Sequence, residues 1–177
     1  IERQRITEPA VMYVRSDGDD SNDGQSAATA KATPQSAFDE ATQGPTADQV
    51  VLDVGSGTFS GGLNTRPSNV TSLLLRGVSK TDTTVTATGQ ETLDIGFHRF
   101  EARDIHIDAD DGENGLQAAR GGVHTLSNAD VTGLSGPAPL VSVNNGVLIV
   151  DDGTSISTFD GNGDGNGIAV AGFSSIL

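Results

Sequence analysis

The sequence predicts an all-β protein, a right-handed parallel β-helix (a solenoid) that carries a short N-terminal capping helix. The first observation is a hydrophobic pattern that recurs at spacings of 23 to 26 residues. The second is a series of short strand patterns separated by polar turns. The third is the composition, in which 34% of the residues are hydrophobic, 4% are aromatic and 23 residues are glycine. Many short strands joined by turns have this balance, and parallel crossovers are right-handed almost without exception.

The chain is expected to divide into two parts. Residues 1–48 form a lead-in, with a short strand at 11–14 and a polar loop at 15–24 that is dense in turn-forming residues. Residues 49–177 form the coils of the solenoid, and we expect the coils to continue beyond this chain.

A single helix is predicted at residues 34–43. Thr33 can cap its N-terminus, a proline occupies the first helical position, and Gly44-Pro45 ends it. Ala37 and Phe38 belong to one apolar stripe. The first coil of a solenoid leaves an open strand edge, which favours aggregation, and we expect this helix to cover that edge.

The repeat is clearest in the second half of the chain. Apolar runs restart at Leu93, Leu116 and Leu140, which are 23 and 24 residues apart. Glycine-led segments align at spacings of 26 and 24 residues, and this alignment places His98 beside His124 in neighbouring coils. The aligned segments are 96–97, 122–123 and 146–147.

Residues 93–108 indicate how one coil is built. The alternation of apolar and polar residues slips at Arg99 and again at Asp104. Strand side chains have a period of two, so each slip predicts a bend between short strands. Stacked coils, roughly 4.8 Å apart, bury the apolar side that one coil leaves open. The rival fold is an antiparallel sandwich or jelly roll, which would need many tight hairpins. Asn-Gly hairpin signals are sparse in this sequence, and Asn145-Gly146 is the clearest.

The charge of the chain excludes some partners. The formal net charge is −14, with 24 acidic residues against 10 basic ones. Such a surface repels a phosphate backbone, so nucleic acid is not an expected partner. No apolar run reaches the 18 or so residues of a membrane helix, so membrane insertion is not expected. The chain has no cysteine and therefore no disulfide.

The order of motifs in residues 10–60 resembles a known family. Tyr13-Val14 is followed by a loop ending at Asp23-Gly24, then by the helix segment 32–38, a valine-rich strand and Gly57-Thr58-Phe59. This order resembles the opening of pectin-lyase-like β-helix proteins. Its form is similar to tail fibre and tailspike proteins of bacteriophages and related virus-like particles.

The resemblance implies a particular function and assembly. It implies an elongated, homotrimeric virion protein of the phage tail that contacts other tail or baseplate proteins. Outside the cell, such a protein attaches to a host surface polysaccharide or another receptor. One alternative is a polysaccharide depolymerase, lyase or glycoside hydrolase, on the same β-helix. Another is a bacterial surface or secreted adhesin.

The densest charged stretch, residues 98–108, provides candidate site residues. A lyase needs a base to remove a proton beside a uronate, and a cation to neutralise its carboxylate. His98, Arg103 and His124 are therefore the catalytic candidates. Such residues are more typical of a solvated face whose charges pair across strands, so we do not expect catalysis by this segment. The candidates for ligand binding are Glu101, His106 and Asp108.

Two loops have part of a calcium-binding pattern. Residues 160–165 match the first half of an EF-hand loop, but Ala171 replaces its bidentate glutamate. The loop at 19–24 makes a similar half-match. Turns of Gly, Asn and Asp also arise without metal, because these residues tolerate left-handed backbone, so our first expectation is no cofactor. The candidate metal ligands are Asp160, Asn162, Asp164, Asp19 and Asp23.

Overall fold

The architecture was determined from a computed structural model. It describes residues 8–43, 48–65, 70–96, 99–109, 115–118, 121–134, 140–159, 168–171 and 175–176.

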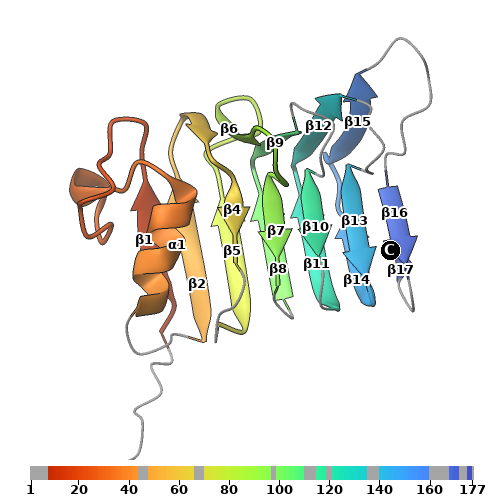
Figure 1. Ribbon diagram of the computed structural model, residues 1–177, viewed down its shortest axis with the longest axis horizontal. Coiled ribbons are helices and arrows are strands. Elements are labelled where there is room, and N and C mark those ends of the chain that lie inside the picture. The colour runs from red at the N-terminus through yellow and green to blue at the C-terminus, as the bar shows by residue number, and fades with distance from the viewer. Residues whose placement is uncertain are drawn as a thin grey trace, which may run out of the picture.

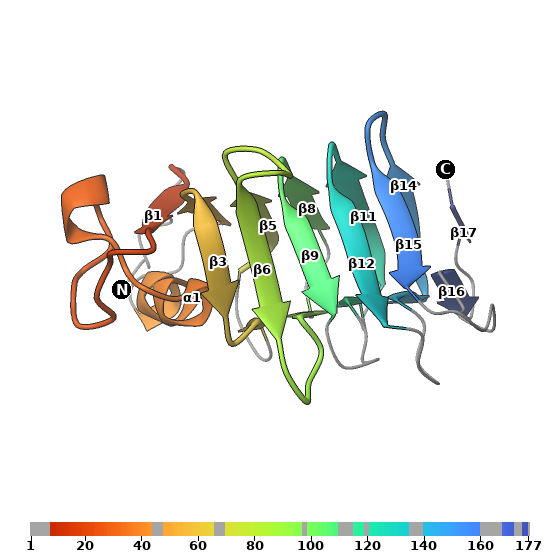
Figure 2. The ribbon, with the colours of Figure 1, turned by 90° about the horizontal axis from the view of Figure 1, so that it is seen from above.

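Three sheets, all of them parallel, run side by side along the molecule. Each coil adds one strand to sheet I, then one to sheet II and one to sheet III. Figure 1 shows the coils stacked along the long axis, and Figure 2 shows the strands of sheet II side by side. The predicted parallel β-helix is therefore confirmed, and the antiparallel rival is wrong.

The strands have the following bounds. Sheet I contains β1 (Ala10–Val14), β2 (Gln49–Val54), β5 (Ser72–Arg76), β8 (Arg99–Arg103), β11 (Gly122–Ser127), β14 (Gly146–Val150) and β17 (Ser175–Ile176). Sheet II contains β3 (Gly57–Ser60), β6 (Thr83–Ala87), β9 (His106–Ala109), β12 (Asp130–Leu134) and β15 (Ser155–Phe159). Sheet III contains β4 (Leu63–Asn64), β7 (Leu93–Ile95), β10 (Leu116–Ala118), β13 (Val141–Asn144) and β16 (Ile168–Ala171).

Inward side chains of the three sheets form one continuous core. Period-two alternation in each strand sends alternate residues inside. In β8, for example, Phe100 and Ala102 are buried, and in β9 Ile107 is buried. Stacked coils align these residues into apolar columns, since each strand pairs with its copies in the coils on either side.

The helix α1 (Pro34–Gln43) closes the N-terminal end of this core. The Thr33 Oγ1 atom accepts a hydrogen bond from the Ser36 backbone N–H at 3.2 Å, which is the predicted cap. Ala37 and Phe38 are buried in the same cluster as the coil residues. The helix packs against β1, β2 and β4, as Figure 1 shows. A short 3₁₀-helix, η1 (Ala27–Thr29), precedes it.

The edge strand β1 is covered by the N-terminal loop rather than by the helix. Tyr13 donates its backbone N–H to the Gly24 carbonyl and accepts one from Lys31, at 2.8 and 2.9 Å. Arg15 donates to the Lys31 carbonyl at 3.0 Å. These bonds occupy backbone groups that would otherwise pair with another chain. The predicted capping helix is therefore confirmed at the core end and at β4, whereas the edge of β1 is covered by the loop.

The register between coils differs in two places from the predicted alignment, and one of them is the pairing of Leu116 with Val141 rather than Leu140. Val123 pairs with Arg99, 24 positions earlier in the chain, so the predicted 26-residue spacing at this step is wrong. The next step, Val123 to Val147, is as predicted. A shift of two residues keeps every side chain on its own face, so hydrophobic periodicity alone cannot exclude it.

The predicted bend at Asp104 is confirmed. Asp104 lies between β8 and β9 with φ of 54°, and Asn128 occupies the same place one coil later with φ of 47°. Asn and Asp adopt this left-handed conformation more readily than other residues that have a side chain. The Asn128 amide donates to Asp104 Oδ1 at 2.6 Å, which joins the two bends. In the described part of the chain, no helix is long and apolar enough to cross a membrane.

Candidate functional site

The bend at Asp104 divides the charged stretch between two faces of the molecule. Arg103 and Glu101 point outward from sheet I, as does Arg99. His106 lies beyond the bend on the outer face of sheet II. The sequence candidates therefore do not form one groove. His98 lies outside the described residues.

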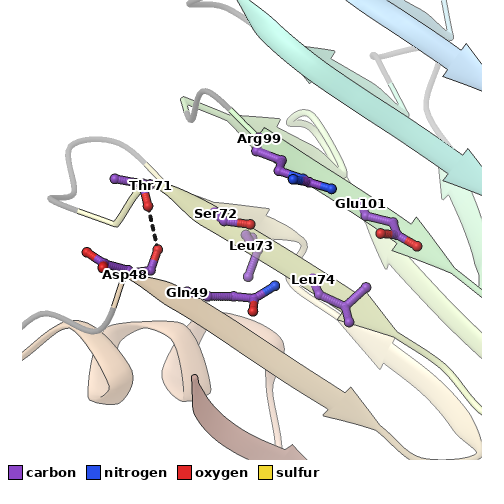
Figure 3. Close-up of a pocket in the computed structure, with 8 residues that line it drawn as sticks. All are labelled: Asp48, Gln49, Thr71, Ser72, Leu73, Leu74, Arg99 and Glu101. Carbon is purple, nitrogen blue, oxygen red and sulfur yellow. Dashed lines mark hydrogen bonds between the residues drawn. The ribbon is translucent and has the colours of Figure 1, made fainter. Parts of the chain in front are cut away.

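A groove lies across the outer face of sheet I. It has a volume of about 430 Å³, within the range of small-molecule sites. Its lining comes from the start of β2 (Asp48 and Gln49), from residues 71–74 of β5 and its approach, and from Arg99 and Glu101 on β8. Figure 3 shows these side chains. Of the predicted site residues, Glu101 lines this groove.

Hydrogen bonds fix the rim of the groove at its β2 side. The Thr71 hydroxyl donates to the Asp48 carbonyl at 2.6 Å, the bond drawn in Figure 3. The backbone N–H of Ser72 donates to the same carbonyl at 3.2 Å. The approach to β5 is thereby held against β2, and the groove floor consists of two paired strands.

The β8 side of the groove contains the side chains of Arg99 and Glu101, and Glu101 is bound by Arg103 from outside the groove. Arg103 donates from Nε and Nη2 to Glu101 Oε1, at 2.9 and 2.5 Å. The Arg99 side chain is exposed and makes no hydrogen bond or ion pair with any residue that the structure describes. The groove therefore contains one guanidinium, that of Arg99, and Arg103 lies outside its lining.

A second charge cluster lies at the far ends of the same strands. The carboxylate of Asp53 accepts hydrogen bonds from Arg76 and from Arg15, the latter at 2.9 Å. Arg15 also lies over the Tyr13 ring, 5.3 Å from its centre. Burial acts to raise the pKa of Asp53, but the hydrogen bonds and charges of Arg76 and Arg15 outweigh burial and hold that pKa below its usual range.

The other two predicted ligand-binding residues belong to a hydrogen-bonded network on sheet II. His106 Nε2 lies 2.6 Å from Thr132 Oγ1, and the Thr132 hydroxyl donates to Asp108 Oδ1 at 3.4 Å. Outward positions of this sheet are rich in hydroxyl side chains. Ser and Thr alternate with apolar residues along these strands, and this alternation is the sequence signal for the face. None of these hydroxyl residues was among the predicted site residues. The outward Ser and Thr residues are Thr58, Ser60, Thr84, Thr86, Thr132, Ser155 and Ser157.

His124 is buried in the core, not exposed in a groove. Its exposed fraction is 0%, whereas the preceding Val123 is 41% exposed. β11 runs without a slip from Gly122 to Ser127, so His124 and Leu126 both point inward. The neighbour of His124 in the preceding coil is Phe100. The predicted pairing of His124 with His98 is therefore wrong, because strand continuity overrides the local preference of valine for the interior.

Carboxylates in the N-terminal loop accept hydrogen bonds from their own loop. Asp19 accepts the Ser21 N–H at 2.8 Å, and Asp23 accepts the Thr29 hydroxyl at 2.6 Å. These bonds lower the pKa of both aspartates below the usual range. Among the described residues, no group of three or more His, Cys, Asp or Glu is arranged to hold a metal. Asp160, Asn162 and Asp164 lie outside the described residues, so calcium there remains a prediction.

Comparison with known proteins adds no relative. The sequence matches no protein-family model and no curated protein, and no solved structure matches either. The class of the protein is given by its architecture alone, which is a parallel β-helix with an N-terminal helical cap and a polar groove on sheet I.

Proposed function

We propose that this chain is a structural and host-attachment segment of a phage-type tail fibre or tailspike, and that the groove on sheet I contacts a surface glycan. The groove is the observation that supports glycan binding most directly. The motif order of residues 10–60, which resembles tail fibre and tailspike proteins, supports the viral context.

The chemistry of the groove suits a sugar ligand. Gln49 and Ser72 carry an amide and a hydroxyl, and they are register partners on β2 and β5. Glu101 and Arg99 add a carboxylate and a guanidinium. Sugar hydroxyls both donate and accept hydrogen bonds, and this set supplies both kinds of partner. Leu74 provides an apolar surface for the C–H face of a sugar ring.

The architecture suits attachment because it is stiff. Every coil is hydrogen-bonded to its neighbours along three sheets, so side chains on the outer face hold fixed spacings of about 4.8 Å along the axis. Preorganised groups lose little entropy when they bind. The proposal includes a homotrimeric assembly joined to other tail proteins and located on the virion, outside the cell.

The proposal is tested by filling the groove. We expect purified protein to bind at least one bacterial surface polysaccharide on a glycan array. We expect Ser72→Trp, which inserts an indole into the groove, to weaken binding at least tenfold. The matched control is Thr86→Trp, an equally half-buried outward position on sheet II, which should bind like the unmodified protein.

Three results would count against the proposal. They are binding to no polysaccharide, equal losses in the two tryptophan variants, and a strictly monomeric mass in sedimentation. Release of reducing ends or unsaturated uronate from the bound polysaccharide would show that the chain is a depolymerase rather than an attachment segment.

A further inference from the structure

The described guanidinium groups gather on one face of an acidic protein. The chain has a net charge of −14 and ten Lys and Arg residues. Arg76, Arg99 and Arg103 all point outward from sheet I, and Arg15 directly follows β1 of the same sheet. The two lysines lie elsewhere, with Lys31 buried in the N-terminal loop and Lys80 bonded to Asp130.

Two of these arginines are stacked as like charges. Arg76 and Arg103 are direct register partners on neighbouring strands, and their side chains are 45% and 46% exposed. Like charges directly opposite each other destabilise a sheet. Asp53 and Glu101 offset this repulsion in part, but Asp53 is shared between Arg76 and Arg15.

The unpaired Arg99 lies where a ligand in the groove would meet it. Gln49, Ser72 and Arg99 form one outward row across β2, β5 and β8. A guanidinium presents a rigid fork of N–H donors that matches a carboxylate, and such charge-assisted pairs are stronger than neutral hydrogen bonds. An anion held by Arg99 would have the Ser72 hydroxyl beside it in the same row.

We infer that the sheet I groove selects a carboxylate-bearing polysaccharide, with Arg99 as the first anion contact. This inference rests on the proposed glycan attachment and names its ligand class. Glu101 opposes this ligand, because its carboxylate lines the same groove and repels a second carboxylate.

The test uses two tetrasaccharides that differ only in charge. One is β-1,4-linked mannuronate, and the other is β-1,4-mannotetraose, in which each carboxylate is replaced by a hydroxymethyl group. Calorimetric titration should show at least tenfold tighter binding of the charged probe by the unmodified protein. Arg99→Gln should weaken charged-probe binding about tenfold, the effect of losing one charge-assisted contact, and weaken neutral-probe binding by a clearly smaller factor.

Glu101→Gln gives a result of opposite sign. Removing this carboxylate takes a negative charge out of the groove lining, so the charged probe should bind several-fold more tightly. Arg99→Gln and Glu101→Gln lie on the same strand and the same face but should change affinity in opposite directions. A general loss of fold would lower affinity in both variants. Lys80→Gln is the charge-matched control, since it removes one positive charge from the turn between β5 and β6, outside the groove lining, and charged-probe binding should stay unchanged.

Several results would overturn the inference. Equal affinity for the two probes would do so while leaving glycan attachment intact, whereas a negative polysaccharide array refutes attachment itself. Failure of both probes to bind, or a loss of affinity in Glu101→Gln, would also overturn it. Altered self-association in Arg99→Gln with unchanged probe binding would instead make this face an interface between copies of the chain.

Discussion

At the scale of single residues, His124 is the most unusual side chain of the described core. It lies in an inward column between Phe100 and Leu148. Its Nε2 atom lies 3.2 Å from the Gly121 carbonyl, while its Nδ1 atom has no partner. A buried polar atom without a partner costs roughly 1–3 kcal/mol, so the core tolerates this histidine at a loss of stability.

We therefore expect His124→Leu to stabilise the protein by about 1–3 kcal/mol at pH 7, because it removes the unpaired nitrogen and matches Leu148 in the next coil. Chemical denaturation measures this change. A destabilised variant would show that the imidazole makes a needed contact.

The same residue predicts a pH dependence. Burial lowers the pKa of His124 below the usual value, and the hydrogen bond to Gly121 only partly opposes this. The unfolded chain therefore takes up the proton first, and stability falls as the pH drops below about 6.5 through the folded pKa. When the free energy of unfolding is measured by denaturation from pH 7.5 to 5, the His124→Leu variant should not show this part of the decrease at low pH. His106→Asn, at an outward position, should keep it.

At the scale of elements, two of the edge strands at the N-terminal end, β1 and β4, are covered in different ways. Loop backbone covers β1, whereas one side chain covers β4. The Asn64 N–H donates to Gln35 Oε1 at 2.7 Å, and Gln35 Nε2 donates to the Asn64 carbonyl at 3.1 Å. The Gln35 amide thus pairs with β4 as a neighbouring strand would, and it ties α1 to sheet III.

Replacing Gln35 should therefore weaken this end of the solenoid. We expect Gln35→Ala to lower the free energy of unfolding by about 1 kcal/mol, since the three lost bonds, two to Asn64 and one to Asp39, are solvent-exposed. The freed edge should also raise the rate of aggregation, measured by light scattering. Gln43→Ala, at an exposed position in the last turn of the same helix, is the control. A similar loss in both variants would assign the effect to helix propensity.

At the scale of the whole molecule, Lys80 links coils that are not neighbours. It lies in the turn before β6, yet its Nζ atom donates to Asp130 Oδ1 at 3.0 Å and to the Gly153 carbonyl at 2.6 Å. β9 lies between β6 and β12 in sheet II. Solenoid stability is normally a sum of terms from single coils and adjacent pairs, and this contact adds a longer-range term.

We expect Lys80→Gln to lower the free energy of unfolding by about 1 kcal/mol, because the ion pair is partly exposed and two hydrogen bonds are lost. A double-mutant cycle with Asp130→Asn should give a coupling energy of roughly 0.5–1 kcal/mol that shrinks at high salt. Strict additivity of the two substitutions would show that this contact does not join the coils.

Local signals in the sequence were sufficient for the elements. The cap at Thr33, the helix at 34–43 and the bend at Asp104 were all predictable, because capping and left-handed turns depend on a few adjacent residues. The repeat length also predicted the parallel β-helix. Of the candidate site, the sequence indicated the charged strand but not the groove, since the groove is built from three strands far apart in the chain.

The sequence by itself determined that this protein is a parallel β-helix with a helical cap, because periodicity and turn chemistry are properties of short segments. Only the tertiary structure decided which residues meet between coils. A two-residue shift of register leaves the hydrophobic pattern intact, and backbone pairing of whole strands selects one alignment. The uninterrupted strand β11 buries His124, and the alignment stacks Arg76 on Arg103 and places Arg99 in a groove on an otherwise acidic protein.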